Sequence, residues 1–115
     1  MGSDLKYATL HNANLQGADM QGALFTTVSL TNASLDNGNL TNSQFTQAYL
    51  KNVSFVGANL QGANFQGCCL EGANLDAANL EGATLNEVRY DDQTVWPKGF
   101  SPPSSAQSFI QSFGP

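Results

Sequence analysis

The sequence predicts an all-β protein wound as a solenoid, and two regular features of the chain support this fold class. A large apolar side chain occurs at every fifth residue from Leu5 to Tyr90, at eighteen positions without interruption. The residue two positions before each of them is small or β-branched, most often Ala, as Ala58 is before Leu60. A five-residue period would be spread around an α-helix, and it would alternate between the faces of a continuous strand. A chain that bends in the same sense once per repeat instead buries both the large and the small residues, each in a column along the solenoid.

Each repeat divides into a short extended segment and a corner. In one repeat, Ala58 and Leu60 point inward, Asn59 points outward, and Gln61 and Gly62 turn the chain. The second corner residue is Gly or Asn in twelve repeats, and these two residue types best tolerate a positive φ. The twelve corner residues are Gly17, Gly22, Gly57, Gly62, Gly67, Gly72, Gly82, Asn12, Asn32, Asn37, Asn42 and Asn52.

Three segments resemble consecutive units of the pentapeptide-repeat proteins, whose consensus is Ala, Asp or Asn, Leu, and two variable residues. They are 58–62 (Ala-Asn-Leu-Gln-Gly), 63–67 (Ala-Asn-Phe-Gln-Gly) and 73–77 (Ala-Asn-Leu-Asp-Ala), and the resemblance covers residues 3–92. It implies a right-handed quadrilateral β-helix with four repeats per coil, or about four and a half coils in this chain. The segment 90–100 is similar to the one that ends many cyanobacterial members.

With four repeats per coil, residues twenty apart stack on successive rungs at about 4.8 Å. One inward column then contains three phenylalanines, whose stacked rings would add about 0.5 to 1.5 kcal/mol per pair beyond their burial. We expect the structural core to include these rings and two further large side chains: Phe25, Phe45, Phe65, Leu60 and Tyr90.

Two segments are expected, a β-helix over 3–92 and a C-terminal cap over 93–115. A solenoid exposes apolar core and unpaired strand edges at its ends, and these need covers. Ser104 or Ser105 is a suitable N-cap for a short helix with an apolar face, which would close the last coil together with two aromatic residues. The cap residues predicted in this way are Trp96, Phe100, Phe109, Ile110 and Phe113.

The first coil, near Leu5, Tyr7 and Leu10, has no comparable cover in the sequence. It is either left open at a cost in stability or docked against another surface, such as a second copy of the chain. We expect weak self-association through this coil.

Composition indicates one small soluble domain of 115 residues with a net charge of −5. The basic residues Lys6, Lys51, Arg89 and Lys98 lie far apart, so no basic stripe is available to follow a phosphate backbone, and nucleic-acid binding is not expected. No apolar stretch is long enough to span a membrane, and the N-terminus lacks the pattern of a signal peptide. A cytoplasmic protein without membrane contact is expected, although a removed targeting segment stays an open alternative.

The sequence offers few residues for chemistry. His11 is the single histidine, and no serine elbow or cysteine pair with metal-ligand spacing accompanies it. Alternation places Cys68 inward and Cys69 outward, the latter as a solvated thiol or, alternatively, one that forms an intermolecular disulfide or senses oxidation. Asp91 and Asp92 fit a turn at the end of the last coil better than a catalytic pair. We therefore predict no catalytic residues, no metal site, no cofactor and no enzymatic activity.

Two classes of function remain. The first is a rigid structural or protein-interaction module, with another protein as its partner. Its candidate contact residues are the outward exceptions to a polar surface: Leu24, Tyr49, Val56 and Cys69. The second is a DNA mimic that modulates DNA gyrase, which the resemblance implies because some family members act in this way. This chain is short and weakly charged in comparison with those members.

Overall fold

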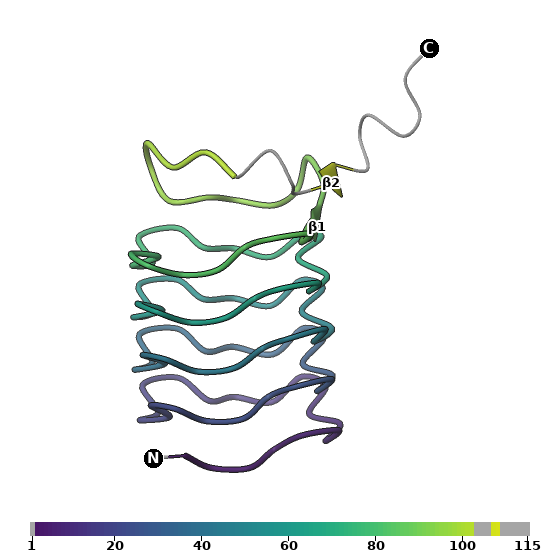
Figure 1. The fold of residues 1–115 in the computed structure, drawn as a ribbon, viewed down its shortest axis with the longest axis vertical. Coiled ribbons are helices and arrows are strands. Elements are labelled where there is room, and N and C mark those ends of the chain that lie inside the picture. Colours follow the sequence, from purple (N-terminus) through teal and green to yellow (C-terminus); the bar gives the residue numbers. More distant parts are fainter. Residues whose placement is uncertain (1, 103–106, 109–115) are drawn as a thin grey trace.

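The computed structural model of the protein describes residues 2–102 and 107–108, and these form a stack of coils along one axis (Figure 1). Isolated parallel bridges join residues twenty apart, from Asp4 with Leu24 to Cys69 with Arg89. One coil therefore contains four five-residue repeats, and each repeat adds one outward residue to a narrow parallel sheet.

The stacked coils have four faces, which we name after one outward residue of each. The Leu24 face contains Asp4, Leu24, Gln44, Asn64 and Thr84; the Tyr49 face contains Thr9, Ser29, Tyr49, Cys69 and Arg89; the Ser54 face contains Asn14, Ser34, Ser54, Asn74 and Val95; the Asn59 face contains Asp19, Asn39, Asn59 and Asn79.

Three backbone hydrogen bonds per repeat join consecutive coils. On the Tyr49 face, the amide of Ser29 donates to the Ala8 carbonyl of the preceding coil at 2.9 Å, and the amide of Leu30 donates to Tyr49 in the following coil at 2.9 Å. At a corner, the amide of Gly62 donates to the carbonyl of Glu81 at 2.9 Å. The extended residues and the corners are thus both paired with their neighbours, which leaves few unsatisfied backbone groups inside the stack.

The corners are type II turns, in which the third residue has a positive φ. The amide of Ala63 donates to the carbonyl of Leu60 at 3.0 Å across such a turn, and Gly62 has a φ of 70°. All twelve Gly and Asn corners predicted from the sequence have a positive φ. Five corners with other residue types have the same conformation: Tyr7, Thr27, Gln47, Ala77 and Glu87.

At some corners a glycine also leaves space for a side chain of the preceding coil. A Cβ atom on Gly57 would lie only 2.5 Å from Oδ1 of Asn37, the corner residue of the preceding coil. The asparagine side chain therefore occupies the volume that the glycine leaves free. Glycine is not obligatory after asparagine, because Asn32 and Asn52 each follow an asparagine in their own column.

The core is the interior of the tube. Phe25, Phe45, Phe65 and Leu60 are completely buried. The rings of Phe25 and Phe45 stack with centroids 4.6 Å apart, those of Phe45 and Phe65 with centroids 5.0 Å apart, and Phe55 packs edge-on against the last two. The expectation for Tyr90 is wrong, because this side chain is only half-buried and lies edge-on to Trp96 at the end of the stack.

The C-terminal segment crosses the last coil. β1 (Arg89–Tyr90) pairs in parallel with β2 (Gln107–Ser108), which adds one more rung to the Tyr49 face (Figure 1). The helix predicted for this segment is therefore wrong at Gln107 and Ser108, since the free edge of β1 pairs with them as a strand. The predicted cap residues Phe109, Ile110 and Phe113 lie outside the described residues, whereas Trp96 and Phe100 pack against the core.

One residue is inserted where the regular coils end. Asn74 pairs with Val95, twenty-one residues ahead rather than twenty. Oδ1 of Asp91 accepts from the amide of Gly72 at 3.0 Å, in place of the backbone carbonyl that receives this bond at other corners. Asp91 and Thr94 thus form a turn, as the sequence predicted for Asp91, and this turn redirects the chain across the end.

Candidate functional site

The Tyr49 face and the corner that follows it carry most of the basic side chains of the protein. Three of the five Lys, Arg and His side chains lie here, namely His11, Lys51 and Arg89. Tyr49 projects from an extended backbone and is 53% exposed. It pairs directly with Cys69 on the next rung, so a phenol and a thiol are neighbours on a flat surface.

An ion pair lies at the C-terminal side of this face. Nε of Arg89 lies 3.7 Å from Oε2 of Glu71, and the Glu71 side chain is only 12% exposed, against 46% for Arg89. The carboxylate is held against the coil while part of the guanidinium faces solvent. A partner that approaches the face therefore meets the cation rather than the acid.

The two cysteines differ in their surroundings. Burial of the Cys69 thiol and, after it, the nearby charge of Glu71 raise its pKa above the ordinary value, and Arg89 opposes this effect. Burial raises the pKa of Cys68 much further, and its Sγ donates to the carbonyl of Phe45 at 2.6 Å. Because the thiolate is the reactive form, neither position favours nucleophilic chemistry at neutral pH.

His11 and Ser29 form a contact at the other side of the same face, with Nε2 and Oγ 2.5 Å apart. Both groups are solvent-accessible. In the described part of the chain, no carboxylate hydrogen-bonds to the second ring nitrogen of His11. The pair thus lacks the group that orients the histidine of a serine hydrolase, so we interpret it as a surface hydrogen bond.

These pairs follow a rule that sequence reasoning missed. His11 with Ser29 and Glu71 with Arg89 are each eighteen residues apart. Asp36 and Ser54, whose Oγ donates to the Asp36 carboxylate at 2.5 Å, have the same separation. A corner side chain reaches the outward residue of the following coil on the face it has just left. With a coil of twenty residues, polar residues at i and i+18 are therefore the signal for such pairs.

The structure brings only two of the four predicted contact residues together. Tyr49 and Cys69 are adjacent, whereas Leu24 lies on a different face and Val56 at a corner beyond the Ser54 face. Leu24 and Val56 are both half-buried. Sequence alternation separates outward from inward residues, but it does not tell which outward residues share a face.

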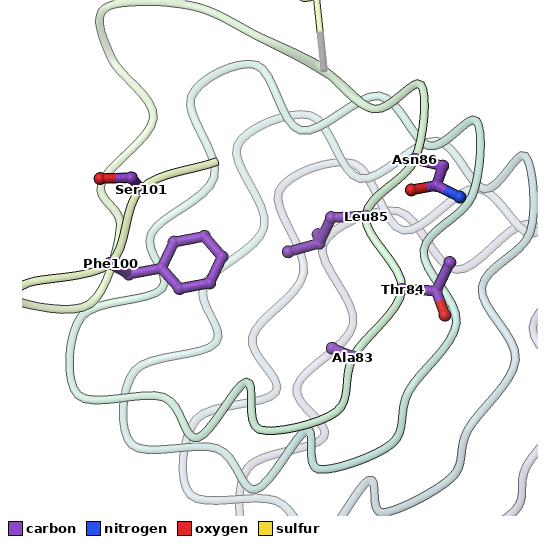
Figure 2. A pocket seen from close by; sticks show the side chains of 6 residues that line it. All are labelled: Ala83, Thr84, Leu85, Asn86, Phe100 and Ser101. Carbon is purple, nitrogen blue, oxygen red and sulfur yellow. The ribbon is translucent and has the colours of Figure 1, made fainter. Parts of the chain in front are cut away.

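A hollow of about 410 Å³ opens at the C-terminal end, where the Phe100 ring and the Leu85 side chain point toward one another (Figure 2). Ala83, Thr84, Asn86 and Ser101 complete its wall, and none of the residues that line it is charged. Among residues 2–102 and 107–108, no cluster of three or more His, Cys, Asp or Glu side chains is arranged to hold a metal ion. In the same part of the chain, no helix has the length and apolarity to cross a membrane.

A family model described as pentapeptide repeats (8 copies) matches residues 3–42, 29–67 and 39–76. The chain belongs to the pentapeptide-repeat family. No functionally curated protein matches it. Among solved pentapeptide-repeat proteins, Rfr23 from the cyanobacterium Cyanothece 51142 is 35% identical, and the match covers 76% of this chain and 63% of Rfr23 with a TM-score of 0.51. This chain thus spans less than two thirds of the length of Rfr23.

Two further pentapeptide-repeat structures resemble the chain. The protein alr5209 from Nostoc PCC 7120 is 34% identical over 91% of this chain and 84% of its own, with a TM-score of 0.44. A trypsin-treated form of QnrB1, a plasmid-mediated fluoroquinolone resistance protein, is 19% identical over 95% of this chain and 60% of its own, with a TM-score of 0.47.

Proposed function

We propose that this pentapeptide-repeat chain is a rigid, non-catalytic interaction module that binds another protein through its Tyr49 face. The observation that carries the proposal is the exposure of Tyr49, 53% of whose surface is open, in the middle of a flat parallel sheet. Tyrosine is enriched at protein interfaces because it buries a large apolar area and keeps a hydrogen-bonding hydroxyl, at little cost in conformational entropy.

The surroundings of Tyr49 support this assignment. Cys69 adds a small apolar neighbour on the next rung, and Arg89 lies one rung further with its guanidinium partly exposed. The combination of an aromatic residue with an arginine is typical of the residues that dominate binding energy. The backbone beneath them is fixed by hydrogen bonds on both sides, so little ordering entropy is lost on binding.

The Asn59 face offers a comparison within the molecule. Its outward residues are Asp19, Asn39, Asn59 and Asn79, and the last three each accept a bond from the amide two residues ahead through Oδ1. These side chains are already engaged with their own corners and bury little apolar area. A polar face of this kind is well suited to solvation.

Mimicry of DNA toward gyrase requires acidic side chains on successive rungs. Among the described residues, only the corner with Glu71 and Asp91 has acids on two consecutive coils. Glu71 is paired with Arg89, and Asp91 is bonded to the amide of Gly72. We therefore do not propose this second function.

The experiment compares Tyr49→Asp with the matched control Asn59→Asp, which adds the same charge at the same repeat position on the Asn59 face. Each protein is used to capture partners from a lysate of the source cells, and a captured protein is then purified and titrated by calorimetry. We expect Tyr49→Asp to raise the Kd of that purified partner at least tenfold, or about 1.4 kcal/mol. Asn59→Asp should change it less than twofold. Equal retention of every captured protein by both variants would contradict the proposal.

A further inference from the structure

We propose that two copies of this chain associate head to head through the coil formed by residues 4–20, which we call the first coil. Its inward side chains Leu5, Leu10, Leu15 and Met20 are only half-buried. One coil further, the residues that occupy the same columns are completely buried: Phe25, Leu30, Leu35 and Leu40. This surface is distinct from the Tyr49 face, so the inference stands or falls independently of the proposed function.

The backbone of the first coil presents a free strand edge with a regular pattern. In the second coil, Ser29 donates its amide to Ala8 and accepts at its carbonyl from Leu10, so both groups point toward the first coil. Thr9 has the equivalent position one coil earlier, and neither its amide nor its carbonyl is bonded within the described residues. The same holds for Asp4, Asn14 and Asp19. Four residues therefore each direct one donor and one acceptor away from the stack.

This pattern is self-complementary. In a hydrogen-bonded antiparallel pair, two opposite residues exchange both of their N–H···O bonds. A two-fold axis perpendicular to the solenoid axis relates the two copies, and it reverses the direction in which the first coil of the second copy winds. Every strand at the end of one copy therefore meets an antiparallel strand of the other copy. A second copy thus satisfies all four edge residues and covers the apolar end in one step. The symmetric interface also closes, which prevents growth into a fibre.

Charge selects one arrangement of the two copies. A four-sided end allows four settings of the two-fold axis, and three of them place carboxylates opposite one another: Asp4 with Asp4, Asp19 with Asp19, or Asp4 with Asp19. In the fourth setting, the axis passes through the corner at Lys6 and Tyr7. Asp4 then faces Thr9 of the second copy, and Asp19 faces Asn14. Like charges directly opposite across strands are destabilising, so we infer the fourth setting.

This setting accounts for an exposed aromatic side chain. Tyr7 is 75% exposed, the largest exposed fraction among the large apolar residues described. At the corner on the axis, the two Tyr7 side chains meet. Lys6 shares this corner, and its ammonium lies 4.0 Å from Oδ2 of Asp4, which offsets the approach of the two cations.

The size of the end indicates a weak dimer. The shortest extent of the molecule, 20 Å, indicates an end of roughly 400 Å² per copy, or about 800 Å² for the pair. This value is small for a specific interface, which indicates association that depends on concentration rather than an obligate dimer.

Sedimentation equilibrium over a series from micromolar to millimolar protein tests the association. We expect a monomer–dimer equilibrium and no larger species. Tyr7→Asp should raise the dimer Kd at least tenfold, because it places two carboxylates on the axis. Gln47→Asp is the matched control, since Gln47 occupies the same corner two coils away with a similar φ, and it should leave the Kd unchanged. A monomer at millimolar concentration, or equal effects of the two variants, would overturn the proposal.

Disulfide cross-linking tests the setting. Antiparallel neighbours have Cα atoms about 4.5 to 5.5 Å apart, a distance that a disulfide spans. In a Cys69→Ser background, chains with Asp4→Cys are mixed with chains that carry Thr9→Cys and are oxidised. We expect cross-links between the two kinds of chain and few between chains that both carry Thr9→Cys, because these keep Asp4 and Asp19. Cross-linking of Thr9→Cys chains with each other, or no cross-link between the two kinds of chain, would overturn the inferred setting.

Discussion

The first and last coils of this solenoid are built from the same repeat but differ in how their apolar side chains are covered. At the C-terminal end, Leu80 and Leu85 are 8% and 5% exposed under Trp96 and Phe100, and Asp91 replaces a missing backbone carbonyl. At the N-terminal end, the described residues provide no such cover, and Leu5 is half-buried. The pentapeptide sequence is as regular at one end as at the other. Burial in this fold is therefore a property of stacking between neighbouring coils, and a repeat alone does not provide it.

The largest expected contrast is between two leucines of one inward column. Leu50→Lys places an unpaired charge at a site with no exposure, and we expect a loss of more than about 4 kcal/mol or failure to fold. Leu10→Lys occupies the same column in the first coil, where the ammonium can reach water, and should cost about 1 kcal/mol. Urea denaturation at micromolar protein measures both. Equal losses would show that the first coil is as enclosed as the interior.

The next contrast concerns the aromatic cover. Trp96→Ala removes a ring that packs against Tyr90 and Phe100, with centroids 5.6 and 5.4 Å away, and should weaken the last coils by about 2 kcal/mol. Maleimide labelling of the buried Cys68 reports local opening, and its rate should rise about thirtyfold. Tyr7→Ala at the other end should leave that rate unchanged. An unchanged rate in Trp96→Ala would remove Trp96 from the cover.

Much of the fold could be predicted from the sequence because the same pattern of inward, outward and corner residues occurs in every repeat. The five-residue period separated inward from outward residues, and Gly and Asn marked twelve corners correctly. Thr27 has a φ of 58° although a β-branched residue resists this conformation. Its corner is imposed by the coil it pairs with, since its amide donates to the carbonyl of Thr46, so its local preference is overridden.

The surface and the tail were less predictable for a physical reason. The neighbourhood of Tyr49 depends on residues twenty positions away, and that spacing came from the family resemblance rather than from the period of five. Gln107 and Ser108 have polar side chains with no strand pattern of their own, yet they pair with β1 because the last coil leaves an open edge. Such a contact is set by the partner strand and leaves no signal in the segment that makes it.

A smaller contrast is expected for the turn that ends the regular coils. Oδ1 of Asp91 accepts from the amides of Gly72 and Gln93, both at 3.0 Å. Asp91→Ala leaves these donors without the acceptor and should cost about 1 to 3 kcal/mol, whereas Asp91→Asn keeps an oxygen there and should cost less than about 1 kcal/mol. Asp4→Ala, which removes an exposed bond to the amide of Lys6, should cost less than about 0.5 kcal/mol. Chemical denaturation ranks the three, and a reversed order would contradict the role of Asp91.

The smallest contrast uses two serines of one column. Ser43 is completely buried, and its Oγ has no hydrogen-bond partner among the described residues, whereas Ser3, just before the first coil, is exposed. Ala23 and Ala63, one rung below and one above Ser43, are also completely buried, which shows that a methyl group fits this column. Ser43→Ala removes a desolvated hydroxyl and should stabilise the protein by about 1 kcal/mol, a rise in Tm of about 4 °C. Ser3→Ala should leave the Tm unchanged, because that hydroxyl is hydrated in the folded and unfolded states alike. Thermal melts decide between the alternatives: a lower Tm for Ser43→Ala would mean that Oγ has a bonded partner inside the tube. An equal rise for Ser3→Ala would mean that burial does not distinguish the two positions.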